Sequence, residues 1–186
     1  MSQKIAVVGA GFIGRSWAMV FSKAGHHVSL YDIDPAALSE AMNLLEINIA
    51  DLESNGLISS KDDLLGRIQP YKTLEGAVEE ADWVQENALE NVQIKRELFS
   101  RMDELLPETT ILASSTSAIP CSDISNGMKG AGRIIVAHPA NPPYLLPIVE
   151  LSGAPETRDE TIFRAKELLE AADMEVITIN KEIKGF

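Results

Sequence analysis

A glycine-rich turn near the N-terminus most constrains the fold of this 186-residue chain. The turn, Gly9-Ala10-Gly11-Phe12-Ile13-Gly14, follows the apolar run Ile5 to Val8 and precedes apolar residues at helical spacing. In such a strand–turn–helix unit the first glycine permits the tight turn, the second lets a pyrophosphate approach the backbone, and the third lets the helix pack on the strand. Because the bare pattern is weak, its surroundings decide between a dinucleotide site and a structural turn without a ligand.

An acidic residue stands where a dinucleotide site requires one. Residues Val28 to Asp32 are predicted to form the second strand, and Asp32 follows the glycines at about the 20-residue spacing expected for a ribose-binding acid. A carboxylate at this position accepts hydrogen bonds from the ribose hydroxyls and repels a 2′-phosphate, which favours NAD over NADP. Arg15 lies too early in the helix to serve clearly as a partner for a 2′-phosphate.

Strands and helices alternate along the whole chain. This alternation predicts an α/β fold of the Rossmann type, with a doubly wound, mostly parallel sheet and helices on both faces. Strands are predicted at residues 5–8, 28–32, 68–71, 81–86, 110–113, 133–137, 146–151 and 175–179, and helices at 12–24, 35–54, 62–65, 74–80, 91–106 and 156–172.

A histidine follows one of the apolar strands and opens the run His138-Pro139-Ala140-Asn141-Pro142-Pro143, which leads on to Glu150. An imidazole can act as general base in alcohol oxidation near neutral pH, and a carboxylate can orient it. Ligands of open α/β sheets bind beyond the C-terminal ends of the strands, so residues at those ends are expected to share one site. The other residues at predicted strand ends are Gly9, Asp32, Glu86 and Ser117.

Several of these polar residues have two interpretations on the sequence alone. His138 is a general base or a turn histidine, and Glu150 is its partner or an ordinary strand carboxylate. The cluster Ser114 to Ser117 forms a turn, or it directs hydroxyl donors at a substrate oxygen. Glu90 and Lys95 are exposed helix charges, or they contact the ribose and nicotinamide half of a cofactor. The three histidines and single cysteine show no ligand spacing, so no metal site is predicted.

Composition excludes some classes of partner. The net charge of −12 argues against a nucleic-acid surface and against docking on an anionic membrane. It does not argue against an anionic cofactor, because the N-terminus of a helix binds phosphate locally. No apolar run approaches the roughly 18 residues of a membrane span. With Cys121 as the single cysteine, no intrachain disulfide can form, and a cytoplasmic location is predicted.

Together, these residues resemble the N-terminal NAD-binding domain of the 3-hydroxyacyl-CoA dehydrogenase family over essentially the whole chain. Aromatic residues usually follow the histidine in the acyl-CoA enzymes, whereas Pro139 and Ala140 stand there in this chain. This difference favours the λ-crystallin branch of the family, which includes L-gulonate 3-dehydrogenase. The matching segments are Gly9 to Met19, Leu30 to Ile33, Ser114 to Ser117 and His138 to Leu151.

The resemblance implies a role for each matching residue. His138 and Glu150 correspond to the catalytic histidine and its carboxylate, and Ser117 to a serine that contacts substrate and cofactor. Glu90, Lys95 and Asn141 correspond to positions that line the nicotinamide end of NAD. The implied reaction is oxidation of the 3-hydroxyl of a small, L-gulonate-like 3-hydroxy acid. The alternatives are a 3-hydroxyacyl-CoA substrate, or a non-catalytic NAD-binding or crystallin-like module.

The resemblance also implies a second domain. Residues 1–182 are expected to form the NAD-binding domain, and residues 183–186 to begin a helical C-terminal domain that this chain lacks. In the family that domain supplies an asparagine near the histidine, closes the substrate cleft and makes the homodimer interface. The 186-residue chain by itself is therefore expected to be inactive.

Overall fold

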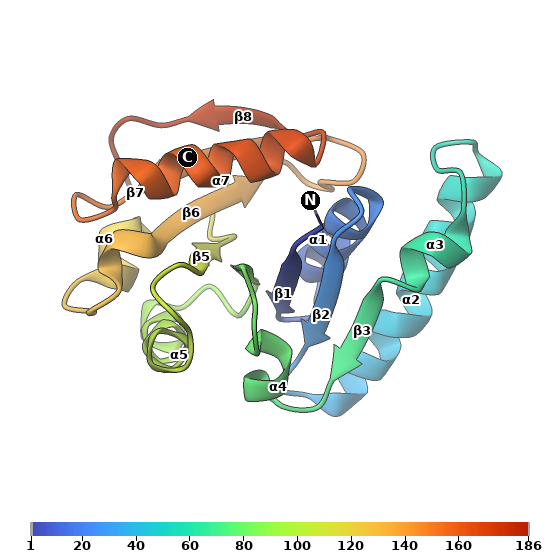
Figure 1. The fold of residues 1–186 in the computed structure, drawn as a ribbon, viewed down its shortest axis with the longest axis horizontal. Helices are drawn as coiled ribbons and strands as arrows, with labels where there is room; N and C mark the ends of the chain where they lie inside the picture. Colours follow the sequence, from blue (N-terminus) through green and yellow to red (C-terminus); the bar gives the residue numbers. More distant parts are fainter. Residues whose placement is uncertain (1, 186) are drawn as a thin grey trace.

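The computed structural model describes residues 2–185 as one eight-stranded sheet with helices on both faces (Figure 1). The strand order is β3-β2-β1-β4-β5-β6-β7-β8. Six neighbouring strands, β3, β2, β1, β4, β5 and β6, are parallel to one another. Strand β7 runs antiparallel to β6, and β8 is parallel to β7. The predicted Rossmann-type fold is confirmed, with the direction of the sheet reversing at β7.

The bounds of the elements are close to those predicted. The strands are β1 (Lys4–Val8), β2 (His27–Tyr31), β3 (Ile68–Tyr71), β4 (Trp83–Glu86), β5 (Ile111–Ser114), β6 (Ile134–Pro139), β7 (Ile148–Gly153) and β8 (Glu175–Thr178). The helices are α1 (Phe12–Lys23), α2 (Pro35–Ser54), α3 (Lys61–Leu65), α4 (Leu74–Val78), α5 (Val92–Leu105), α6 (Cys121–Ser125), α7 (Asp159–Ala171) and the 3₁₀ turn η1 (Ala131–Arg133). Among residues 2–185, no helix is both long and apolar enough to cross a bilayer.

Two features of the fold differ from the prediction. Helix α6 and the turn η1 lie in a stretch for which no element was predicted. The strand that carries His138 was predicted to end at Ala137, but β6 continues to Pro139. It continues because Ala137, His138 and Pro139 pair with β7, and the Ala140 N–H donates to the Ile148 carbonyl at 2.8 Å. His138 therefore lies within a paired strand and not in the loop after it.

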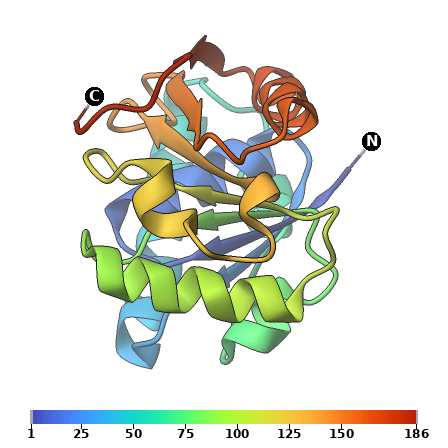
Figure 2. The ribbon, with the colours of Figure 1, turned by 90° about the vertical axis from the view of Figure 1, so that its left-hand side faces the viewer.

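The core has two layers, one on each face of the sheet. On one face α1, α2 and α7 pack on the strands, and the Trp17 and Phe21 rings of α1 stack with centroids 5.1 Å apart. On the other face α4, α5 and α6 cover alternate residues of the same strands, with Phe99 and Met102 of α5 fully buried. Figure 2 shows α5 in the foreground with the strands behind it. Burial on both faces explains why these strands are almost continuously apolar.

The parallel strands bring distant parts of the chain to one edge of the sheet. Strands β1, β2, β4, β5 and β6 all end at that edge, because they run in the same direction. The glycine turn follows β1, Asp32 follows β2, and the Ser114 to Ser117 loop follows β5. Residues as far apart in sequence as Gly9 and Ser117 are thereby gathered where α/β folds bind their ligands.

Two glycines of the turn differ in how much space a side chain would have, and this difference can be tested. A Cβ atom at Gly14 would lie 1.8 Å from the Gly9 carbonyl oxygen, whereas one at Gly11 would meet no atom within 4 Å. Gly14→Ala should therefore push α1 away from β1 and lower the free energy of unfolding. The loss should be at least that of a typical overpacked core site, which is roughly 1–3 kcal/mol. Urea denaturation measures the loss.

Gly11→Ala is the matched control. It should unfold close to the wild type but bind NADH more weakly, because its methyl group occupies space that a pyrophosphate needs. Equal destabilisation by the two substitutions would contradict this account of the turn.

Candidate active site

His138 and Glu150 form a close pair at the end of β6. They are directly opposite each other in the β6–β7 ladder, and His138 Nδ1 lies 2.8 Å from Glu150 Oε2. Both side chains are partly open to solvent, with 26% and 32% of their surface exposed. A carboxylate at Nδ1 holds the imidazole proton on that nitrogen, which makes Nε2 the basic nitrogen. The pair has the geometry of a general base with an orienting carboxylate.

Asp32 is fixed against the glycine turn. Its Oδ2 accepts a hydrogen bond from the Ala10 N–H at 2.7 Å, and its Oδ1 accepts one from the Asp34 N–H at 2.9 Å. Gly9 has a φ of 97°, in the left-handed region that glycine tolerates best. The turn and the predicted ribose-binding acid are thus one hydrogen-bonded unit.

The start of α1 is suited to an anion. Gly11 is its N-cap and provides no side-chain cap, and the first turn holds no acidic residue. The first N–H groups of a helix have no partner within the helix and carry a partial positive charge. The side of Gly11 on which a Cβ would stand is open for 4 Å, so a phosphate can approach the backbone there. The first turn, with Phe12 and Ile13, therefore fits the pyrophosphate of NAD.

A fully buried ion pair lies beneath the ends of β4 and β5. The Lys95 ammonium on α5 donates to Glu86 Oε1 at 2.8 Å and to Oε2 at 3.0 Å, and the two side chains are 1% and 0% exposed. Glu86 also accepts hydrogen bonds from the Ala88 N–H and from the Ser114 hydroxyl, both at 2.6 Å. Lys95 was predicted to contact the cofactor. The structure shows it neutralising a buried carboxylate, and a cofactor contact stays a prediction.

Glu90 organises the loop after β5. It accepts hydrogen bonds from the Thr116 hydroxyl at 2.5 Å and from the N–H groups of Ser117 and Ala118 at 3.1 and 3.2 Å, and it lies 3.6 Å from the Lys95 ammonium. Burial acts to raise the pKa of the Glu90 carboxyl, but these hydrogen bonds and the lysine charge outweigh it, so the pKa lies below its ordinary value. Glu90 is therefore ionised at neutral pH, facing the predicted nicotinamide end of the site.

The hydroxyl cluster is mostly structural. Ser114 donates to Glu86 and Thr116 to Glu90, while the Ser115 hydroxyl accepts from Trp17 and Gln85 and donates to Asn87. These three hydroxyls support the turn interpretation. Only Ser117 is exposed, and it is the one serine of the cluster that the resemblance marks as a ligand contact. Asn141 is also exposed, in the loop between β6 and β7, and its role stays a prediction.

Two adjacent polar residues of β4 support this region. Glu86 was expected at the site from its position at a strand end, and Gln85 had no predicted role. Glu86 is the central acceptor of the buried ion pair, and Gln85 bonds to Ser115 and, at 3.4 Å, to the Ala137 carbonyl next to His138. Their signal in the sequence is two adjacent polar residues at the end of a strand that is buried throughout. Such residues require internal partners, because an unpaired polar group in the core is costly.

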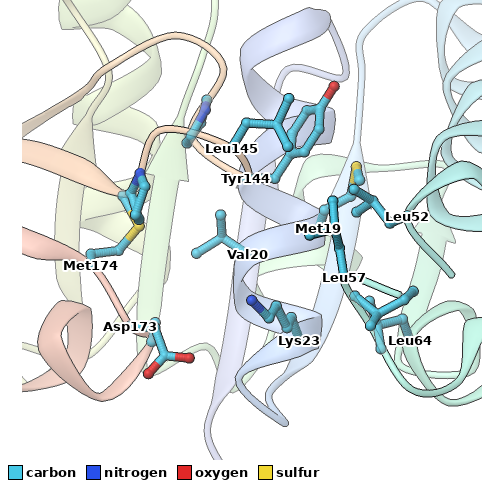
Figure 3. Close-up of a pocket in the computed structure, with 14 residues that line it drawn as sticks. Met19, Val20, Lys23, Leu52, Leu57, Leu64, Tyr144, Leu145, Asp173 and Met174 are labelled. Carbon is cyan, nitrogen blue, oxygen red and sulfur yellow. The ribbon is translucent and has the colours of Figure 1, made fainter. Parts of the chain in front are cut away.

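The structure also contains a pocket that is separate from these residues. It has a volume of about 250 Å³ and lies between α1, the segment after α2 and the 143–147 loop (Figure 3). Met19, Leu52 and Met174 are among its mostly apolar lining residues, and Lys23 and Asp173 also line it. None of the predicted site residues lines this pocket, so we assign the chemistry to the edge with His138 and Glu150.

Comparison with known proteins identifies the family. Residues 4–183 match the family of 3-hydroxyacyl-CoA dehydrogenase NAD-binding domains. The chain belongs to the 3-hydroxyacyl-CoA dehydrogenase family. The predicted family and the predicted cofactor, NAD, are thus both confirmed. The assignment of the glycine turn and Asp32 to the cofactor stays a prediction.

Individual relatives support the same family assignment. The chain is 38% identical to the λ-crystallin homolog of Bos taurus over 185 residues, which are 98% of this chain and 58% of that protein. It is 37% identical to an L-carnitine dehydrogenase of Streptomyces griseus, over 99% of this chain and 54% of that protein. The structure of 3-hydroxybutyryl-CoA dehydrogenase from Escherichia coli matches with a TM-score of 0.91 at 28% identity, over 96% of this chain and 38% of that one. The dehydrogenase domain therefore spans little more than half the length of these curated relatives.

The buried ion pair leads to a prediction for stability. Lys95→Met leaves the Glu86 carboxylate buried without its cation, which should lower the free energy of unfolding by about 3–5 kcal/mol. Urea denaturation followed by circular dichroism measures this loss.

The double variant Glu86→Gln/Lys95→Met removes both charges and should recover a substantial part of the stability. Lys166→Met is the control, because Lys166 lies 3.6 Å from Glu170 on the exposed surface of α7, where such pairs contribute about 0–1 kcal/mol. A loss for Lys95→Met no larger than that of the control would contradict the role given to the pair.

Proposed function

We propose that this chain is the cofactor-binding half of an NAD-dependent dehydrogenase that oxidises the 3-hydroxyl of a small 3-hydroxy acid. The observation that carries the proposal is the His138–Glu150 pair, 2.8 Å apart, at the same edge of the sheet as the glycine turn. A base alone, or a dinucleotide turn alone, is common in proteins. Both at one edge of a doubly wound sheet support hydride transfer from an alcohol.

The residues divide the work of alcohol oxidation between them. Bound NAD supplies the acceptor for the hydride from the 3-carbon. His138 Nε2 accepts the proton of the 3-hydroxyl, and Glu150 stabilises the imidazolium that results while it holds the ring in place. Positioned acid–base groups of this kind contribute about 10²–10⁴-fold to the rate. Ser117 and Asn141, both exposed at this edge, orient the substrate and the nicotinamide.

A free 3-hydroxy acid is the substrate class that we favour. Pro139 and Ala140 stand directly after the histidine, where the acyl-CoA enzymes usually carry aromatic residues. Among the relatives, the λ-crystallin homolog and L-carnitine dehydrogenase are 38% and 37% identical, compared with 28% for the 3-hydroxybutyryl-CoA dehydrogenase structure. Carnitine is itself a free 3-hydroxy acid, as is gulonate. A 3-hydroxyacyl-CoA thioester is the second candidate.

The proposal extends to the rest of the enzyme. The relatives are longer than this chain, which supports a further domain in the whole protein. We propose that this domain begins at residues 183–186, completes the substrate cleft and forms a homodimer. The reaction would take place in the cytoplasm. A non-catalytic, crystallin-like module remains the alternative from another class, and it differs in having no turnover when NAD is bound.

Substitution of the histidine separates the enzyme from the inert module. In the protein that carries both domains, His138→Gln should leave NADH affinity within about twofold of the wild type and lower kcat by about 10²–10⁴-fold, because the base is lost and the cofactor turn is not. NADH fluorescence and steady-state kinetics measure the two quantities.

His27→Gln is the control, because His27 is exposed at the start of β2, at the opposite end of the sheet. It should change neither quantity. Retained turnover in His138→Gln would remove the histidine from its role, and failure of the wild type to bind NADH at millimolar concentration would refute the dehydrogenase proposal.

The substrate class is tested by comparing kcat/KM for free 3-hydroxy acids with kcat/KM for a CoA thioester. The protein with both domains should oxidise L-gulonate or L-carnitine with a higher kcat/KM than 3-hydroxybutyryl-CoA, because the residues after His138 lack the aromatic side chains of the acyl-CoA enzymes. Side-by-side values at saturating NAD provide the ratio. A higher kcat/KM for the thioester would reverse our ranking.

A further inference from the structure

Arg15 lies over the glycine turn. It is the first residue after Gly14, in the first turns of α1. Side chains of a helix point toward its N-terminus, so a long side chain at this position reaches back along the turn. The structure shows this directly, because Arg15 Nη1 donates to the Ala10 carbonyl at 3.3 Å. The guanidinium is therefore beside the Ala10-Gly11 segment.

The guanidinium uses little of its hydrogen-bonding capacity. It has five N–H donors. The bond to Ala10 is the one that the residues 2–185 provide, and the buried Nε has no partner. No carboxylate of the described residues lies within ion-pair distance of Arg15. Arg133, whose Nε also lacks a partner, differs because its Nη2 is 2.7 Å from Asp103 Oδ1 and its two Nη groups donate to four backbone carbonyls. Arg15 is thus a partly buried cation without an anion.

The start of α1 also offers Arg15 no acidic partner. The first turn of α1 holds no acidic residue, and Gly11 caps it without a side chain. The space beside Gly11 is open for 4 Å. The Asp32 carboxylate is already engaged with the N–H groups of Ala10 and Asp34. The helix N-terminus, the open space and the cation without a partner are all complementary to one small anionic group.

We propose that Arg15 binds the pyrophosphate of NAD, together with the N–H groups at the start of α1. Parallel strands lie about 4.8 Å apart, so His138 on β6, three strands from β1, is about 14 Å from the turn. A substrate held at His138 is therefore too distant for Arg15, whereas the pyrophosphate passes directly over Gly11. The proposal rests on the NAD-binding domain of the family and is independent of the substrate class.

Nucleotide fragments test this contact on the 186-residue chain. Arg15→Met keeps the length of the side chain and removes its charge. It should weaken binding of both ADP and NADH by about 10- to 100-fold, as expected when a charge-assisted hydrogen bond is lost, and leave adenosine binding unchanged. Arg15→Lys should recover part of the affinity, because an ammonium preserves the charge but not the guanidinium geometry. Isothermal titration calorimetry measures each affinity.

Arg67→Met is the matched control. Arg67 also donates one hydrogen bond to a backbone carbonyl, that of Ser22 at 3.1 Å, but it precedes β3 at the other end of the sheet. It should leave ADP affinity unchanged.

Three results would overturn the proposal. They are unchanged ADP affinity in Arg15→Met, an equal loss for adenosine and ADP, which would show a general loss of the site, and no binding of ADP by the wild type.

Discussion

The proposed active site rests on one buried carboxylate. Glu86 ends the central strand β4 and is fully buried, so it is tolerated only because Lys95, Ser114 and the Ala88 N–H all donate to it. These donors come from α5, from β5 and from the loop after β4. Lys95 in turn lies 3.6 Å from Glu90, which holds the Thr116 to Ala118 loop. A charge that would be unfavourable alone thereby fixes the loop that presents Ser117.

The reversal of the sheet at β7 serves the other half of the site. Because β7 is antiparallel to β6, Glu150 comes back beside His138 after only eleven intervening residues, and both lie on paired strands. A shift of one residue in the register would turn the Glu150 side chain to the opposite face. The 2.8 Å contact is therefore set by backbone hydrogen bonds of the ladder, which hold a base and its orienting group more rigidly than a loop would.

Local patterns carried the sequence predictions that succeeded. The glycine turn, the spacing to Asp32 and the alternation of strands and helices are short-range signals, and they predicted the fold and the cofactor. The family was predicted from the resemblance of longer segments, His138 to Leu151 among them. Contacts between distant residues were not predictable in the same way. Trp17, Gln85 and Ser115 meet in one hydrogen-bonded network from three separate elements, and no local pattern relates them. The length of β6 was misjudged for the same reason, because its last residues are strand only through their pairing with β7.

An acidic chain that binds a dinucleotide must meet the cofactor's negative charge locally. The net charge is −12, and Asp32, Glu90 and Glu150 all lie at the edge of the sheet that carries the proposed NAD site. Charges farther away than about 8–10 Å are largely screened at physiological ionic strength, so the groups in contact with the pyrophosphate dominate its binding. At the start of α1 these are the first N–H groups of the helix and the guanidinium of Arg15, with no acid in the same turn. The absence of acidic residues from the first turn of α1, in a chain rich in them elsewhere, therefore supports the proposed pyrophosphate site as much as the glycines do.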